Sequence, residues 1–311
     1  MWRVCAQSHV PGPQRIQVKS SRSAELALLG ITSVWGLTFV VVQDAVEQMP
    51  VTAYLAYRFV AAALLLAVVF RKRLTLLTKA AFRQGLWMGV FLAAGYLFQT
   101  YGLEATSASN AGFITGLFVV ITPLMAWGLN RQSIGWVPWA AAGVSAIGLF
   151  LLSGGGSTFT FRGDGLELLC AIAFSAHIIA TSRGVKAGHD VIALVVVQLT
   201  LVGVVCTAMA VAEGDLVMPH GAGLWANLAL TSLITTALAF VVQTWAQKHA
   251  APDRTALILA GEPAFAGLFG WWLAGDRLGL QGWIGAALIF GAILAVETIP
   301  RLRPPRPLPE G

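Results

Sequence analysis

The residue pair in this chain best placed to do chemistry is Glu262-Pro263, which lies inside an apolar run from Thr255 to Ala274. A carboxylate in such a run can bind a substrate ammonium or carry a proton, or it can be a structural group bonded to a neighbouring helix. Because proline has no N–H, Pro263 is expected to kink a helix and free the carbonyl of Leu259. Pro123 is expected to kink an earlier apolar segment in the same way.

Two further groups are charged or titratable within apolar segments. Arg58 lies six residues into its segment, which is about 9 Å deep at 1.5 Å per residue. It could meet a substrate carboxylate, reach outward to the membrane surface, or pair with an acidic loop. His177 lies near the middle of another segment and could relay protons or be hydrogen-bonded in the packing. Glu262 is expected to be the only acidic residue deep in any segment.

Two glutamines occupy matching positions in a repeated pattern and could line a polar cavity. Gln99-Thr100 in "FQTYGLEATSAS" (98–109) aligns with Gln243-Thr244 in "VQTWAQKHAAPD" (242–253). Aromatic residues near these glutamines or in other segments could complete a polar-aromatic lining, although aromatics of membrane proteins often form interfacial belts instead. The aromatic candidates are Trp35, Tyr96, Tyr101 and Trp245.

The elements that must position these residues are membrane helices. The chain has 57% hydrophobic and 11% charged residues and a net charge of +6, whereas soluble domains carry about 25% charged residues. Its mean hydropathy is +0.75, so the surplus of apolar side chains must face lipid. A crossing helix needs about 20 mostly apolar residues. The runs that qualify are 24–43, 52–70, 84–103, 110–129, 135–152, 166–183, 191–212, 225–245, 254–274 and 282–299.

The basic residues orient these ten segments. If the N-terminus is cytoplasmic, 17 of the 20 Lys and Arg lie inside, Arg162 and Arg277 lie outside, and Arg58 lies within a segment. This bias places both termini in the cytoplasm of a bacterial-type plasma (inner) membrane. The same placement argues against nucleic acid as a partner, because the basic residues lie in tails and short loops that face anionic lipid. Residues 1–23 and 300–311 are expected to be a basic disordered tail and a Pro/Arg-rich tail.

The segments form two related halves. Besides the Gln-Thr match, Pro123 aligns with Pro263, and "IGLFLL" (147–152) aligns with "FGAILA" (290–295). Each repeat, 24–152 and 164–299, therefore holds five helices. Because five is odd, the second repeat enters the membrane from the opposite side, as in many secondary transporters. The predicted fold is an all-α integral membrane protein with ten transmembrane helices as two inverted five-helix repeats.

Four stretches carry a resemblance to a known family. They are "SVWGLTFV" (33–40), "LAYRFVAAALLL" (55–66), "YGLEATSASNAGFITGLFVVITPL" (101–124) and "AGEPAFAGLFGWWLAGDRLGLQGWIGAALIFGAILA" (260–295). Together they resemble the EamA-type transporters of the drug/metabolite transporter superfamily, which implies a two-repeat basket and export or exchange of small metabolites such as amino acids. The family often has Gly-Glu-Arg after the fourth helix of a repeat. This chain has Gly275-Asp276-Arg277 in the second half but Leu129-Asn130-Arg131 in the first.

The favoured function is thus a secondary transporter, an efflux permease or exchanger, that alternates access between its repeats. Its expected partners are a small-molecule substrate, membrane lipid and, as a candidate coupling ion, the proton, in a monomer or homodimer. The alternatives are a channel or a non-transporting membrane scaffold. A membrane-embedded enzyme is disfavoured because the sequence has no HExxH or GxSxG motif, and no cofactor or metal is expected.

Overall fold

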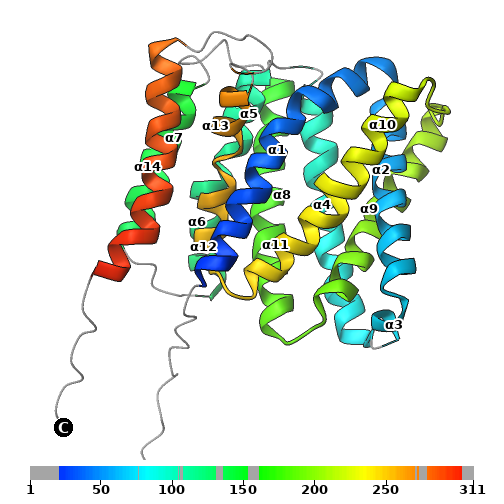
Figure 1. The fold of residues 1–311 in the computed structure, drawn as a ribbon, viewed down its shortest axis with the longest axis horizontal. Helices are drawn as coiled ribbons and strands as arrows, with labels where there is room; N and C mark the ends of the chain where they lie inside the picture. The colour runs from blue at the N-terminus through cyan, green and yellow to red at the C-terminus, as the bar shows by residue number, and fades with distance from the viewer. Residues whose placement is uncertain are drawn as a thin grey trace, which may run out of the picture.

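The computed structural model describes residues 21–75, 77–103, 105, 108–130, 136–152, 161–269, 272 and 279–302. Within these ranges the chain is helical and contains no strand (Figure 1). The first half consists of α1 (Arg22–Gln48), α2 (Val51–Val69), the short α3 (Arg71–Leu74), α4 (Lys79–Leu103), α5 (Ala108–Gly116), α6 (Phe118–Asn130) and α7 (Trp136–Leu152). The second half consists of α8 (Phe161–Lys186), α9 (Val191–Glu213), α10 (Ala222–Leu230), the π-helix η1 (Thr231–Leu238), α11 (Ala239–Gln247), α12 (Pro252–Leu259), α13 (Glu262–Phe269) and α14 (Leu280–Leu302).

The ten predicted segments are mostly helical where the structure describes them, and two of them contain a break. By length and composition, four helices could cross a membrane: Val51–Val69, Arg162–Lys186, Val191–Glu213 and Ala222–Gln247. Shorter apolar helices cover Ile114–Leu129, Trp136–Leu152 and Leu280–Ala295. The first helix begins and the last helix ends at the same end of the bundle (Figure 1). Most of the two predicted tails, and the loops that carry Arg131 and Arg277, lie outside the described residues.

Two of the predicted segments are interrupted, and in both the break comes before the proline. The segment 110–129 divides at Leu117, between α5 and α6, while Pro123 lies inside α6. This break comes before Pro123 and directly after Gly116, the last residue of α5. The segment 254–274 divides at Ala260 and Gly261, so Pro263 follows the break as the second residue of α13. A proline in the first turn of a helix is tolerated, since its missing N–H has no intrahelical acceptor there.

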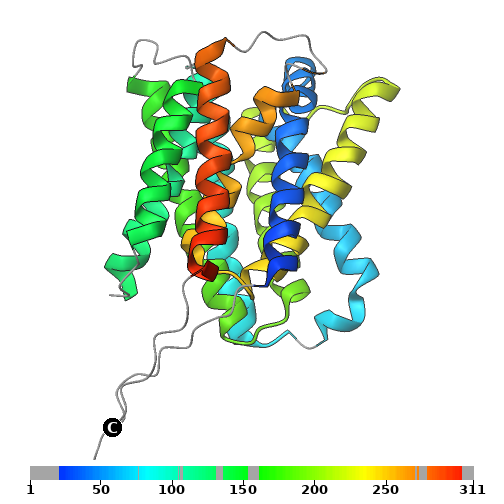
Figure 2. The same ribbon diagram turned by 60° about the vertical axis from the view of Figure 1, so that its left-hand side comes forward.

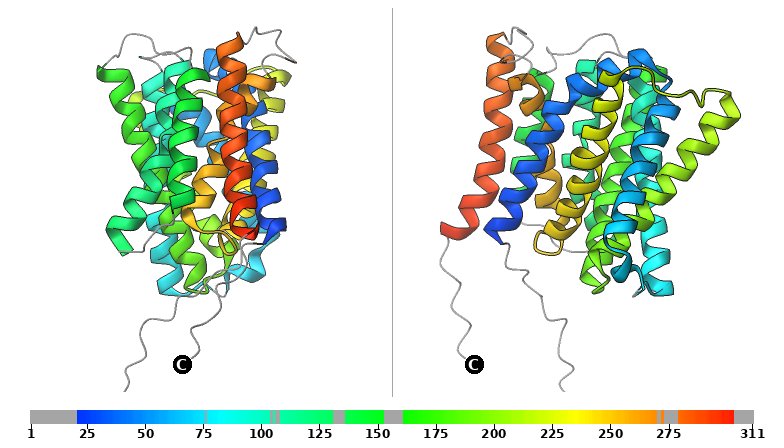
Figure 3. Two further views of the ribbon diagram at one scale, coloured as in Figure 1. Left: turned by 90° about the vertical axis from the view of Figure 1, so that its left-hand side faces the viewer. Right: turned by 45° about the vertical axis from the view of Figure 1, so that its right-hand side comes forward.

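The two halves interlock rather than forming separate domains. The five most extensive helix pairings, α4 with α8, α2 with α9, α7 with α14, α4 with α9, and α1 with α13, all join one half to the other. The helix α14 runs along the outside of the bundle (Figure 2). In both views of Figure 3, helices from the two ends of the colour range share one bundle.

The pairings also follow the internal repeat. In the repeat, α1 corresponds to α8, and α6 corresponds to α13. The pair α1–α13 therefore corresponds to the pair α8–α6, and the helices of both pairs are in contact. The pairs α2 with α9 and α7 with α14 map onto themselves. This symmetry of packing is the architecture expected of two related repeats that form one body.

Apolar side chains also cover the outside of the bundle. Leu64 and Val68 of α2, and Val204 and Val211 of α9, are exposed although both helices pack against each other through their opposite faces. A monomeric soluble protein rarely exposes continuous apolar surface of this kind. The outer faces of these helices are therefore suited to lipid, which identifies the chain as an integral membrane protein.

At the end of the bundle where α1 begins, two ion pairs differ sharply in burial. Arg254 of α12 bonds Glu25 of α1 at 3.0 Å, with the Glu25 side chain 2% exposed. Arg73 of α3 bonds Asp190 at 2.8 Å, with 60% of the Arg73 side chain exposed. We expect Arg254→Gln to lower the free energy of unfolding by about 1–3 kcal/mol, because it takes a charged partner from a buried carboxylate.

Arg73→Gln is the matched control for this substitution. An exposed ion pair contributes about 0–1 kcal/mol, so the melting temperature of this variant should stay close to that of the parent protein. Thermal unfolding of the two purified variants in one detergent checks both statements. Equal melting temperatures for Arg254→Gln and Arg73→Gln would show that the buried pair does not hold α1 to α12.

Candidate functional site

Arg58 is buried in the middle of the bundle and is held by two hydroxyl groups. Its side chain lies on α2 and the residue is 5% exposed. Its Nε donates to Thr236 Oγ1 at 2.6 Å, and one terminal nitrogen donates to Thr235 Oγ1 at 3.0 Å. The guanidinium therefore neither reaches the membrane surface nor pairs with an acidic loop. Both of its hydrogen-bond acceptors are neutral hydroxyl groups.

The π-helix η1 supplies those hydroxyls. A π-helix is rare and occurs mostly as a short insertion at functional sites, because its wider turn changes which backbone groups are paired. Thr235 of η1 accepts from Arg58 through its hydroxyl and from Trp35 Nε1 through its carbonyl oxygen, at 2.8 Å. One residue thus ties α1 and α2 to η1.

Aromatic rings surround the guanidinium. The centre of the Arg58 guanidinium lies 5.6 Å from the ring of Tyr96 on α4 and 5.7 Å from the ring of Phe59. The Tyr96 ring meets Phe59 edge-on at 4.9 Å and Phe174 of α8 at 5.7 Å. Such cation–π contacts stabilise a cation most when it is desolvated, so these rings help Arg58 to remain charged inside the protein.

Glu262 faces this cationic group from the break in the segment 254–274. It is the first residue of α13 and is half-buried. It lies within electrostatic range of Arg58 and of Tyr96. The N-terminus of a helix favours a negative charge, since its free N–H groups point toward it. Among the described residues no ion pair joins Glu262 to Arg58.

We name Trp35, Arg58, Tyr96, Thr235, Thr236 and Glu262 the central cluster. It combines a guanidinium, a carboxyl group that does not pair with it directly, and aromatic and hydroxyl groups around them. These groups come from α1, α2, α4, η1 and α13, which belong to both halves of the chain. The arrangement can hold a small molecule that carries both charges.

The remaining predicted site residues are not all near this cluster. His177 is buried in α8, where its Nε2 is 2.8 Å from Gln198 Oε1 of α9 and its ring lies 6.0 Å from that of Phe240, which also contacts Trp35. Tyr101 donates to Glu213 Oε1 at 2.7 Å near the end of α4. Trp245 is exposed and its ring lies 5.5 Å from that of His249.

The two glutamines have different environments. Gln243 of α11 is buried, and its side-chain oxygen has no hydrogen-bond partner among the described residues. A buried amide oxygen without a donor is costly, so it remains available to a ligand or water. Gln99 of α4 is half-buried.

Sequence patterns do not identify two groups of polar residues that the structure shows to be buried. Thr235 and Thr236 hold Arg58, and the only signal for them is the cluster of hydroxyl residues in "TSLITT" (231–236). The expectation that Glu262 is the only acidic residue deep in a segment is wrong. Glu167 is 0% exposed within α8, because this helix begins at Phe161, five residues before the predicted segment, and so places Glu167 well inside.

Gly36 sets how closely α1 approaches Glu262. A Cβ atom at Gly36 would lie 2.6 Å from the Cβ of Phe265 and 2.9 Å from the carbonyl oxygen of Glu262. Overpacking a tight contact costs about 1–3 kcal/mol. We therefore expect Gly36→Ala to lower the melting temperature and to weaken ligand binding by displacing α13.

Gly30 lies on the same helix and is the matched control. No atom lies within 4 Å of a Cβ built there, and alanine is better than glycine in a helix by about 1 kcal/mol. Gly30→Ala should therefore match or exceed the parent protein in melting temperature. Identical behaviour of the two variants would mean that α1 does not position α13.

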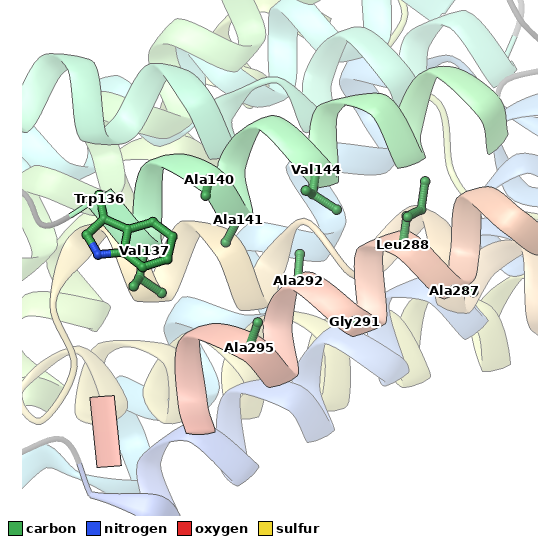
Figure 4. Close-up of a pocket in the computed structure, with 10 residues that line it drawn as sticks. All are labelled: Trp136, Val137, Ala140, Ala141, Val144, Ala287, Leu288, Gly291, Ala292 and Ala295. Atoms are coloured by element: carbon green, nitrogen blue, oxygen red, sulfur yellow. The ribbon is translucent and has the colours of Figure 1, made fainter. Parts of the chain in front are cut away.

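A surface groove elsewhere on the bundle has different chemistry. It lies between α7 and α14 and is lined by Trp136 and by aliphatic residues and glycine, among them Ala140, Val144, Leu288 and Gly291 (Figure 4). None of its lining residues belongs to the central cluster. A groove without charged groups suits apolar chains, so the central cluster is the better site for a polar ligand.

Comparisons with known proteins agree with this architecture. A sequence model of the EamA-like transporter family matches the chain twice, over residues 22–154 and 161–298. An uncharacterized transporter of Archaeoglobus fulgidus is 30% identical over 274 residues, which cover 88% of this chain and 85% of that protein. The crystal structure of another protein, 17% identical, has the same fold with a TM-score of 0.76 over 90% of this chain and 99% of its own. The chain is a member of the EamA-like transporter family.

Proposed function

We propose that the protein is a secondary transporter that exports or exchanges small zwitterionic metabolites such as amino acids. Its family consists of transporters, and its central cluster lies between the two halves. The substrate carboxylate binds Arg58, and the substrate ammonium binds Glu262. The rings of Trp35 and Tyr96 enclose the carbon skeleton.

One observation carries this proposal. Arg58 and Glu262 are opposite charges within electrostatic range, yet they form no direct ion pair. Buried charges are usually paired, because an isolated charge in an apolar medium is strongly disfavoured. A zwitterion placed between them would complete both pairs at once. A purely anionic or purely cationic solute would leave one protein charge uncompensated.

The interrupted helices support alternating access. Discontinuous helices line the substrate sites of many transporters, where helix ends and unwound backbone supply polar contacts near the bilayer midplane. Here α5/α6 and α12/α13 occupy equivalent places in the two repeats, and Glu262 begins the second piece of its pair. Rocking of one repeat against the other would expose the central cluster to each side in turn.

Ten crossings with both termini in the cytoplasm complete the proposal. In a background without Cys5, we expect Met218→Cys to react with a membrane-impermeant thiol reagent added outside intact cells, because the loop after α9 should be external. Ala187→Cys, before α9, should react only after the membrane is opened. Both positions are exposed, and the native Cys170 and Cys206 are buried. The reverse labelling pattern would contradict the predicted orientation of the chain in the membrane.

Ligand-dependent stabilisation of the purified protein tests the function. A ligand at one hundred times its dissociation constant stabilises a protein by about 2.7 kcal/mol, so a bound amino acid should raise the melting temperature clearly. Analogues that lack the amine, or that carry an amide in place of the carboxylate, should raise it much less. If no zwitterion stabilises the protein while other solutes do, the proposed substrate class is wrong.

A further inference from the structure

Glu167 is the strongest unexplained feature outside the central cluster. It lies on α8 and is 0% exposed. Its Oε2 accepts a hydrogen bond of 2.6 Å from Thr115 Oγ1 of α5. Its Oε1 has no hydrogen-bond partner among the described residues, and this oxygen lies against Gly102 of α4, where a Cβ would come within 2.6 Å of it.

The surroundings of Glu167 contain no positive charge in the described part of the chain. The titratable groups that face it are Asp164, one turn before it, and Cys170, one turn after it, both on α8. From α5 and α4 come Thr115 and Gly102, neither of which can ionise. An ionised carboxylate buried without a cation is strongly disfavoured, and the nearby Asp164 would add repulsion.

The two carboxyl groups therefore differ in their neighbours. Glu262 has Arg58 nearby and begins a helix, and both features favour its negative charge. Glu167 has neither feature and has one oxygen free to carry hydrogen. We propose that Glu167 is a proton-binding site of this protein, distinct from the central cluster, and that it is loaded and unloaded during transport.

The position of Glu167 connects it to the moving parts. Thr115 is the second-last residue of α5, next to the break at Leu117 that separates α5 from α6. The Thr115 hydroxyl also lies 3.8 Å from the Cys170 sulfur, and Cys170 is within electrostatic range of both Glu167 and Glu262. Proton loss from Glu167 would alter its bond to Thr115 at the end of α5. A proton at Glu167 can therefore influence the interrupted helix and, through it, access to the substrate site.

Infrared spectroscopy tests the site without any substrate. Purified full-length protein in lipid nanodiscs at neutral pH should show the C=O band of a protonated carboxylic acid. Glu167→Gln should remove this band, whereas Glu262→Gln should retain it. Thr115→Val, which keeps the side-chain shape but removes the hydroxyl donor, should shift the band. A band that survives in Glu167→Gln, or a wild-type protein without such a band, would overturn the proposal.

Transport assays test the coupling, which rests on the proposed function. Proteoliposomes loaded with a mixture of labelled neutral amino acids are assayed for accumulation driven by a proton gradient and for exchange without a gradient. Glu167→Gln should lose the accumulation and keep the exchange. Undiminished accumulation by this variant, or loss of both activities by a folded variant, would refute a separate coupling site. If the wild-type protein moves no amino acid, the transport proposal fails, while the infrared band still decides whether Glu167 binds a proton.

Discussion

Glu262→Gln protein should fold and enter the membrane normally but bind zwitterionic substrates about 10- to 150-fold more weakly than the parent. The range follows from the loss of a hydrogen bond between charged groups, about 1.5–3 kcal/mol. Glutamine keeps the shape of the side chain and its position at the start of α13, so only the charge is removed. Titration of the purified variant with an amino acid, followed by tryptophan fluorescence or calorimetry, measures the change.

The substrate analogue without an amine is the control for this result. The parent protein should discriminate strongly between an amino acid and its deaminated analogue, because only the former pairs with Glu262. The variant should lose most of that discrimination, since its amide cannot provide the charge. Unchanged affinity for the amino acid would leave Glu262 with a purely structural role at the break between α12 and α13.

Arg58→Met should have the larger effect on binding. Truncating one partner of a buried charge pair costs about 2–5 kcal/mol, which corresponds to at least roughly 30-fold in affinity. Methionine fills much of the same space beside Tyr96 and Phe59 but offers no donor to a substrate carboxylate. The discrimination between an amino acid and its amide should therefore disappear in the same titration.

This substitution also leaves Glu262 without its cation, so a second variant separates the two effects. The double variant Arg58→Met/Glu262→Gln should be more stable than the sum of the single changes predicts, with a coupling energy of about 0.5–3 kcal/mol. Thermal unfolding of the four proteins gives this value. A coupling of zero would mean that the two charges do not interact, and the zwitterion site would lose its basis.

The helices and the charged candidates could be predicted from local patterns, whereas their partners could not. Ten apolar runs are visible in the sequence because each helix must match the bilayer on its own. Arg58 and Glu262 stand out because charge is rare in such runs. The hydroxyls that hold Arg58 are 177 and 178 residues away, and no local rule connects them.

The positions of the helix breaks and of the π-helix could not be predicted from local sequence patterns either. A proline in a helical segment predicts a break, but the break in the first half comes at Leu117, before Pro123. The π-helix η1 has no distinctive spacing in the sequence. Its wider turn is recognisable only from the backbone, where Thr235 presents its carbonyl to Trp35 and its hydroxyl to Arg58. Both features depend on packing between the two halves.

The interlocking of the halves has a consequence for biogenesis. The principal partners of α2 and α4 are α9 and α8, which are synthesised much later. At a translation rate of about 5–20 residues per second, about 10–35 s pass between the synthesis of Arg58 and the synthesis of its acceptors Thr235 and Thr236. During this interval the nascent first half holds an unsatisfied guanidinium among apolar helices. The insertion machinery or water must solvate that charge until the second half has been inserted. Assembly of the bundle is therefore completed only after most of the chain has been synthesised.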